Sequence, residues 1–256
     1  MDALTAVRDA LTAAMVGDGG AQGAADRLCA ACVELLLVDG ASISLAVEGA
    51  GSGTLGASSE LSRRVDELQF TYGEGPCLDA VRQGAPVLAP DLTSESEHRW
   101  PAFTRAAGDA GVGAMFALPV GISTLWVGAL GLIREESGAL SAVAWEGGRF
   151  AAELAAHPVL ELIQTEDERT QGSDGPSSIE PTWPQLAGLG RVEVYQATGM
   201  VMAALNISEQ AALARLQAHA FANGMTASEV AWEIVERRLT LDADDDGHAL
   251  DGRTPP

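Results

Sequence analysis

Residues 196–224 read QATGMVMAALNISEQAALARLQAHAFANG, and residues 226–239 read TASEVAWEIVERRL. Apolar residues recur at helical spacing through both stretches, so the pattern predicts helices joined by short turns. Ser208 is a typical helix N-cap, and Thr226 with Glu229 forms a capping box. The pattern therefore predicts a small three-helix bundle, with helices over 185–205, 208–223 and 226–239.

The most specific feature of this bundle is the A-x-G step at Ala197–Gly199, together with the alanine-rich helix that follows it. On these residues, the unit over 185–241 resembles the ANTAR domain of bacterial transcription antiterminators, and its QATGM form looks like the actinobacterial subgroup. The resemblance implies an RNA-binding domain that binds paired stem-loops in a leader transcript and prevents a terminator from forming. Thr198 stands where many members of the family carry a basic residue.

The side chains expected to contact RNA lie on the first two helices of the bundle: Arg191, Gln196, Thr198, Gly199, Arg215 and His219. Arg191 and Arg215 are the expected phosphate contacts, so replacing both by alanine is predicted to abolish binding and leave the helices intact. Arg215 and His219 are four residues apart and share one side of the second helix. A glycine inside a helix costs about 1 kcal/mol against alanine, so Gly199 indicates close approach by another helix or by RNA.

The distribution of charge limits how this unit can bind RNA. The chain has a formal net charge of -21, whereas residues 186–241 carry four arginines against five carboxylates. The acidic bulk disfavours non-specific binding to nucleic acid, so recognition has to depend on the shape and bases of a stem-loop. A DNA-binding repressor would need a recognition helix with a dense basic face, which the second and third helices lack. A helical domain that docks on a protein without binding RNA is the alternative.

Composition narrows the class of the whole chain. Hydrophobic residues make up 47% of the 256, which favours folded domains. All fifteen basic residues are arginine, which excludes Schiff-base lysine chemistry and lysine-dependent phosphate loops. The chain lacks a secretory leader pattern and an apolar run of bilayer length, so a cytoplasmic protein with no membrane contact is expected. Residues 164–184 predict a linker, and residues 242–256 an acidic disordered tail.

The pattern before the linker predicts an N-terminal helix over 1–24 and an α+β domain over 25–163. Further helices are expected at 22–38, 58–69 and 139–164, and strands at 41–47, 86–89, 112–120 and 123–133. The segment 41–47 alternates polar and apolar residues, which is typical of a half-buried strand, and Gly49–Gly53 predicts a hairpin-like turn. The last two strands form an antiparallel pair, so the fold class is an antiparallel sheet flanked by helices, followed by the three-helix bundle.

Three segments of this domain are similar to one family: FTYGEGPCLDAVRQGAPVLAPDL (70–92), RWPAF (99–103) and GALGL (128–132). On these residues the domain resembles a GAF domain, especially the GAF domains that precede ANTAR domains in actinobacteria. The resemblance implies a module that senses a small molecule or another signal rather than an enzyme, and it names neither ligand nor cofactor. The expected sensor pocket includes Phe70, Glu74, Cys77 and Trp100.

Cys77 is the best candidate for chemistry in this domain. It follows GEGP at the expected start of a helix, which lowers the pKa of a thiol, whereas Glu74 and Asp79 raise it. A thiol with a near-normal pKa and poor reactivity is therefore expected, and a GAF-type thiol or redox sensor or enzyme using Cys77 is the alternative. Cys29 and Cys32 form a C-x-x-C, but they lie on the apolar stripe of a helix, which favours core packing over redox chemistry or metal binding.

Two further features concern ligands and assembly. His98 and His157 lack a second ligand at metal-binding spacing, so neither a metal site nor a catalytic residue is predicted.

The long helix carries apolar residues from Leu140 to Ile163, more than one domain is expected to cover alone. This surplus predicts a homodimer that presents two RNA-binding domains to two stem-loops, and packing of the same face on the sheet is the alternative.

Overall fold

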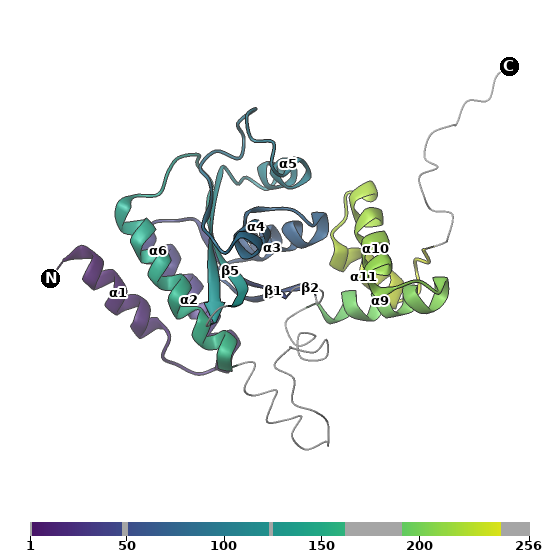
Figure 1. Ribbon diagram of the computed structural model, residues 1–256, viewed down its shortest axis with the longest axis horizontal. Helices are drawn as coiled ribbons and strands as arrows, with labels where there is room; N and C mark the ends of the chain where they lie inside the picture. The colour runs from purple at the N-terminus through teal and green to yellow at the C-terminus, as the bar shows by residue number, and fades with distance from the viewer. Residues whose placement is uncertain (1, 48–50, 123–124, 162–190, 242–256) are drawn as a thin grey trace. The chain divides into compact units, whose positions relative to one another are not determined.

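The computed structural model of the protein describes residues 2–47, 51–122, 125–161 and 191–241. The chain divides into two units, Met1–Gly190 and Arg191–Pro256. The first unit contains a five-stranded sheet, and the second is a helical bundle (Figure 1). The predicted α+β class, an antiparallel sheet flanked by helices and followed by a three-helix bundle, is confirmed.

The sheet of the first unit is antiparallel at every pair of neighbouring strands. Its strands follow the spatial order β2 (Gly51–Ala57), β1 (Gly40–Val47), β5 (Leu125–Arg134), β4 (Ala114–Ile122) and β3 (Val87–Ala89). The pair β4 and β5 corresponds to the antiparallel pair predicted over 112–120 and 123–133. Strands β2 and β3 form the two edges.

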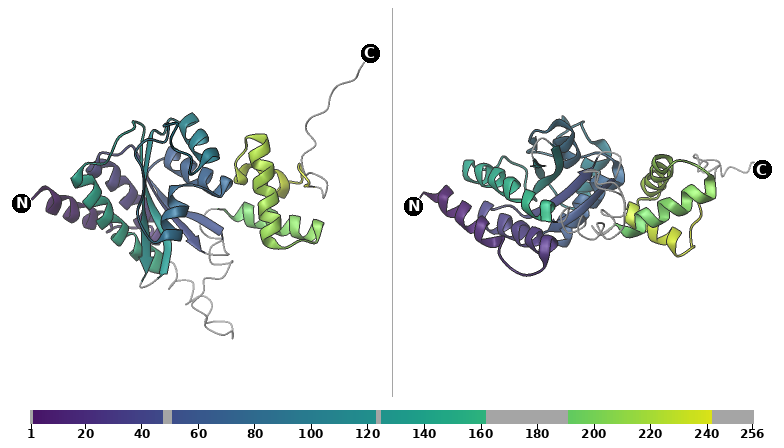
Figure 2. Two further views of the ribbon diagram at one scale, coloured as in Figure 1. Left: turned by 45° about the horizontal axis from the view of Figure 1, so that its top comes forward. Right: turned by 60° about the horizontal axis from the view of Figure 1, so that its bottom comes forward.

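Helices cover both faces of the sheet (Figures 1 and 2). One face packs against α1 (Ala3–Ala14), α2 (Gly20–Leu36) and α6 (Ala142–Leu154), and the other against α3 (Glu60–Tyr72), α4 (Pro76–Gln83) and α5 (Pro101–Asp109). The alternation of side chains along each strand produces two cores. On β4, for example, Phe116 and Leu118 pack with α2 and α6, whereas Met115 and Ala117 pack with α3 to α5.

Strand β1 differs from its prediction as a half-buried strand. Ser42 and Ser44 lie on the face away from Ile43, yet they are only 0% and 6% exposed. Helices α3 and α4 cover that face, so polar side chains that suggested solvent contact lie inside the domain instead.

Strand β2 was not predicted, because its sequence GSGTLGA resembles a turn. The strand begins at Gly51, inside the expected turn over Gly49–Gly53, and pairs with β1 as far as Ala57. Gly56 explains part of this composition, since a Cβ added there would lie 2.6 Å from the carbonyl carbon of Ala25 on α2. The missing side chain lets α2 pack directly on the strand.

The long helix predicted over 139–164 is interrupted. Helix α6 ends at Leu154, a turn follows at Ala155, and helical residues resume over 156–161. Pro158 accounts for the break, because its ring clashes with the carbonyl of the residue four positions earlier. The apolar residues of this segment pack mainly within the domain's own core, which includes Ala144, Ala151, Ala152, Ala155 and Val159, with Leu140, Phe150 and Leu154 against it. Most apolar residues of this segment are therefore explained by packing within the domain, the alternative to a homodimer interface.

The second unit contains α9 (Val192–Leu205), α10 (Glu209–Asn223) and α11 (Ala227–Val235). The predicted caps are confirmed: the Ser208 hydroxyl accepts a hydrogen bond from the N–H of Ala211, and Thr226 and Glu229 form the capping box. Small buried residues such as Ala197, Ala212, Ala220 and Ala231 hold the helices close together. The first six residues of the helix predicted over 185–205 lie outside the described residues.

Candidate functional site

Several polar side chains lie buried between the sheet and helices α3 and α4. They are Ser42 and Ser44 from β1, Thr54 from β2, and Asp66 and Gln69 from α3, each at most 9% exposed. The Thr54 hydroxyl donates to the Asp66 carboxylate, and the Ser44 hydroxyl donates to the carbonyl of Ala129 at 3.4 Å. Among the described residues, Ser42 Oγ and Gln69 Nε2 have no hydrogen-bond partner. We call these five residues the polar cluster.

Cys77 adjoins the polar cluster. Its N–H donates to Gln69 Oε1 at 2.8 Å, and a Cβ added at Gly131 would lie 3.0 Å from its Sγ and 3.3 Å from Ser42 Oγ. Burial raises the pKa of the Cys77 thiol to about 12, and the nearby Asp66 carboxylate adds to this effect. The expectation of a near-normal pKa was therefore wrong, because it considered the helix terminus and ignored desolvation.

Glu74 has a different role from the one predicted for a sensor pocket. Its Oε1 accepts hydrogen bonds from the backbone N–H groups of Ala102 and Phe103, at 2.7 and 2.9 Å. These groups belong to the first turn of α5, which Pro101 opens. Glu74 therefore caps α5 and joins it to the turn before α4.

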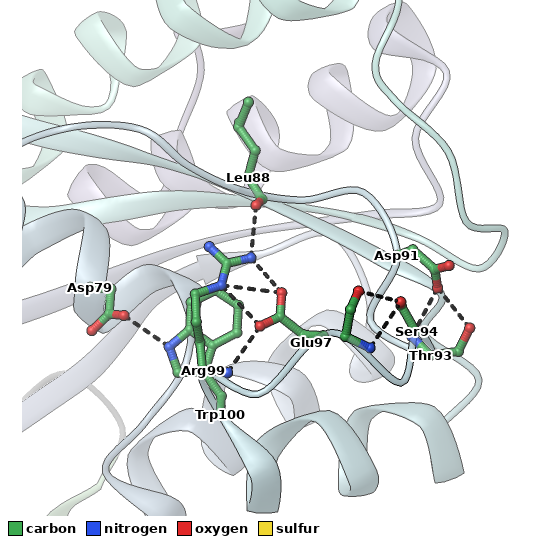
Figure 3. Close-up of polar contacts among 9 residues, drawn as sticks. Asp79, Leu88, Asp91, Thr93, Ser94, Glu97, Arg99 and Trp100 are labelled. Carbon is green, nitrogen blue, oxygen red and sulfur yellow. Dashed lines mark hydrogen bonds and ion pairs between the residues drawn. The ribbon is translucent and has the colours of Figure 1, made fainter.

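Trp100 is held by a network of polar contacts around the loop before α5 (Figure 3). The residue is 2% exposed, and its indole N–H donates to Asp79 Oδ2 on α4 at 2.9 Å. The Arg99 guanidinium lies 4.1 Å from the centre of the Trp100 ring. Its Nη2 donates to the carbonyl of Leu88 at 3.0 Å, and its Nε donates to Glu97 at 2.9 Å. This pairing lowers the pKa of Glu97 and raises that of Arg99.

The structure thus brings together only part of the predicted sensor pocket. Cys77 and Trp100 pack in the same core, which α3, α4 and α5 share with the sheet. Phe70 is buried near the end of α3, and the Glu74 carboxylate, from the turn before α4, binds the first turn of α5. The polar cluster was missed. The sequence of α3 could have indicated it. Asp66 and Gln69 are three residues apart and adjoin Val65 and Leu68, so these two polar side chains lie on the apolar face of the helix.

The other two cysteines lie on the opposite face of the sheet from Cys77. Cys29 and Cys32 are fully buried on α2, in the core shared with α1 and α6, as the prediction of core packing required. Burial raises the pKa of both thiols, that of Cys32 to about 12. Because the sheet separates them from Cys77, neither can act as a resolving thiol for it in this fold.

The residues predicted to contact RNA divide into buried and accessible groups. Arg191 and Thr198 are 3% and 4% exposed, and the Thr198 hydroxyl donates to the carbonyl of Val194 at 2.7 Å. Gln196 and Gly199 are exposed on α9, and beyond the neighbouring residues and backbone of that helix no heavy atom lies within 4 Å of a Cβ added at Gly199. The remaining two, Arg215 and His219, are partly exposed on α10.

Two further properties hold for the part of the chain that the structure describes. It contains no group of three or more histidine, cysteine, aspartate or glutamate side chains suited to hold a metal ion. None of its helices combines the length and the apolar character that crossing a bilayer requires.

The GAF domain family matches residues 20–157, which include the whole sheet and the polar cluster, and the ANTAR domain family matches residues 187–235. The chain therefore belongs to the GAF domain family. With its helical second unit, it is a GAF and ANTAR domain-containing protein. None of the curated proteins compared with the chain matches it.

Solved structures are similar in fold. The GAF domain of a phosphoenolpyruvate-protein phosphotransferase from Acinetobacter is 10% identical, with a TM-score of 0.54 over 65% of this chain and 99% of that one. Its counterpart from Coxiella burnetii is 16% identical, with a TM-score of 0.51 over 66% and 99%. A free methionine-R-sulfoxide reductase from Neisseria meningitidis is 14% identical over 62% and 92%, but its TM-score of 0.45 supports no argument about activity.

Proposed function

We propose that the protein is an RNA-binding regulator of transcription antitermination, in which the GAF domain senses a signal and controls stem-loop binding by the ANTAR domain. The observation that carries this proposal is the ANTAR match over 187–235, which coincides with a capped three-helix unit. Because the target is nascent RNA, the proposal places the protein in the cytoplasm, where it would act without catalysing a reaction.

The RNA-contacting residues in this proposal are the accessible ones. Gln196 and Gly199 are exposed on α9, with open space at Gly199, and Arg215 and His219 are partly exposed polar groups on α10. Arg191 and Thr198 are buried, so replacing Arg191 should disturb the bundle as well as RNA binding. The predicted double replacement of Arg191 and Arg215 is therefore a poor test of contact.

The signal in this proposal is a small polar molecule that binds at the polar cluster. Ser42 Oγ and Gln69 Nε2 are buried hydrogen-bonding atoms without a partner among the described residues, and such atoms are destabilising until they are paired. Trp100, hydrogen-bonded to Asp79, packs in one core with Cys77, whose N–H donates to Gln69 of the polar cluster. The alternative of a thiol sensor or enzyme is less favoured, because the Cys77 thiol is buried and its pKa is raised to about 12.

Gly199→Ala tests RNA binding on the full chain. A Cβ at this position meets open space, and alanine is more favourable than glycine inside a helix by about 1 kcal/mol, so the variant should be more stable. If RNA approaches the backbone here, the added methyl group should weaken binding to a dual stem-loop by about tenfold, equivalent to about 1.4 kcal/mol. Fluorescence polarisation and urea unfolding measure the two effects.

Gln210→Ala is the matched control, since Gln210 is exposed at the start of α10 and is not one of the proposed contacts. A scrambled RNA and a matched duplex DNA test shape specificity. Equal binding of all three nucleic acids, or no RNA binding at all, would contradict the proposal. In the second case the helical unit is better explained as a protein-docking domain.

A homodimer remains part of the proposal, because two stem-loops require two ANTAR domains. Sedimentation velocity at micromolar concentration is expected to show a species of twice the 26.4 kDa chain mass. The apolar residues of the helix predicted over 139–164 are largely covered within the domain, so the proposed dimer now depends on the paired target alone. A single species of one chain's mass, with and without RNA, would show that the protein acts as a monomer.

A further inference from the structure

The described part of the second unit contains four arginines: Arg191, Arg215, Arg237 and Arg238. They are not equally available to an anion. Arg191 is buried, and Arg238 is paired with two carboxylates, Glu233 at 2.8 Å from its Nε and Glu236. Arg237 is exposed, and within the described residues no hydrogen bond or ion pair of its side chain is found. Its side chain is therefore more accessible than that of Arg191, and its charge is less compensated than that of Arg238.

Arg237 also has an unusual backbone conformation. At the end of α11, the N–H of Arg238 donates to the carbonyl of Glu233 at 2.8 Å, and the N–H of Arg237 donates to that of Ile234 at 2.9 Å. This pair of bonds is the Schellman motif, which places Arg237 in the left-handed region with φ of 59°. Glycine is strongly favoured at this position, because other residues are strained there.

Helix α10 shows how the same unit ends a helix without strain. The N–H of Gly224 donates to the carbonyl of Phe221 at 3.3 Å, and the N–H of Met225 donates to that of Ala220 at 2.9 Å. The motif is the same, and glycine occupies the left-handed position with φ of 63°. Ending α11 therefore does not require an arginine. Backbone strain of this kind is concentrated at functional sites, where the side chain has a use that offsets it.

We propose that Arg237 contacts a phosphate of the RNA bound by the ANTAR domain, an inference that rests on the proposed function. A guanidinium provides planar, paired donors that match phosphate oxygens, and this one does not first have to leave a carboxylate. The residue lies two positions beyond the family match, which ends at residue 235. The proposed contact of Arg237 therefore lies outside the segment that matches the ANTAR family.

Arg237→Gly in the full chain tests the inference, because it predicts effects of opposite sign. Relief of the left-handed strain should raise the urea midpoint of the ANTAR domain. Loss of one phosphate contact should weaken stem-loop binding by about tenfold and reduce the slope of log K against log salt by about one unit. Arg238→Ala is the matched control: it removes the same charge next to Arg237, but from a side chain paired with Glu233 and Glu236.

The outcomes separate this inference from the proposed function. Weaker binding with a higher midpoint in Arg237→Gly, and a smaller effect on binding in Arg238→Ala, would support the contact. Unchanged affinity in Arg237→Gly, equal losses in the two variants, or a lower midpoint would overturn it while leaving RNA binding in place. Failure of the wild-type chain to bind the dual stem-loop would instead refute the proposed function, and this inference with it.

Discussion

Trp100→Ala is expected to lower the free energy of unfolding of the GAF domain by about 3–5 kcal/mol, as is typical when a buried tryptophan is truncated. Trp100 is 2% exposed and packs with Phe103 and Cys77 in the core beneath α4 and α5. The variant also removes the hydrogen bond to Asp79 and the ring on which the Arg99 guanidinium lies. Urea unfolding followed by circular dichroism measures the loss.

Trp126→Ala is the matched control in the same domain. Trp126 is 48% exposed and lies over Gly84 and Gly121, so its removal uncovers less buried surface and should have a clearly smaller effect. The loss of stability in Trp100→Phe should be intermediate between those of Trp100→Ala and Trp126→Ala. Phenylalanine keeps most of the buried ring but leaves the Asp79 carboxylate without its indole donor. Equal losses for Trp100→Ala and Trp126→Ala would show that Trp100 does not anchor this core.

The three buried thiols are expected to resist alkylation in the native protein. With a pKa of about 12 instead of the usual 9.0, Cys77 and Cys32 hold about a thousandfold less thiolate at neutral pH than a free cysteine. Reaction with iodoacetamide should therefore be slower by at least this factor until the chain unfolds. Rapid alkylation of Cys77 at neutral pH, coupled to a change in RNA affinity, would instead make the GAF domain a redox sensor.

The same thiols give stability a defined dependence on pH. In the folded chain Cys32 and Cys77 stay protonated up to about pH 12, whereas in the unfolded chain they ionise near 9.0. The unfolded state then binds fewer protons, so the stabilisation is complete below pH 9 and is lost as pH rises toward 12. Each thiol should reduce the unfolding free energy by about 2 kcal/mol between pH 9 and 10.5.

Cys77→Ala is the control for this pH dependence. The variant should lose less stability than the wild type between pH 8 and 10.5, because one of the ionising groups is gone. Identical slopes for the two proteins would show that Cys77 ionises equally in both states, and therefore that it is not buried.

Local signals were sufficient to predict how two helices of the second unit begin. The caps at Ser208 and Thr226 were read correctly, because capping depends on side chains within three residues of the backbone that they satisfy. Strand β2 could not be predicted in this way. Its three glycines indicate a turn, and only pairing with β1 and the close contact of α2 at Gly56 make the segment a strand.

The roles of polar residues depended on contacts that are distant in sequence. Glu74 caps a helix that begins at Pro101, so no nearby residue revealed its partners. The sequence presents Arg191 as a charge and therefore as a phosphate contact, whereas in the folded chain it is only 3% exposed. Ser42 and Ser44 suggested a solvent-facing side of β1, but two helices cover that side.

The contact between Arg99 and Leu88 has a consequence for how copies of the protein meet. Strand β3 is an open edge of the sheet, and such edges are templates for pairing with a strand from another chain. Here the edge strand is only Val87–Ala89, and the Arg99 guanidinium donates a hydrogen bond to the Leu88 carbonyl. An incoming strand would need that carbonyl as an acceptor. The domain is thereby protected at this edge against aggregation by strand addition when copies of the protein are crowded.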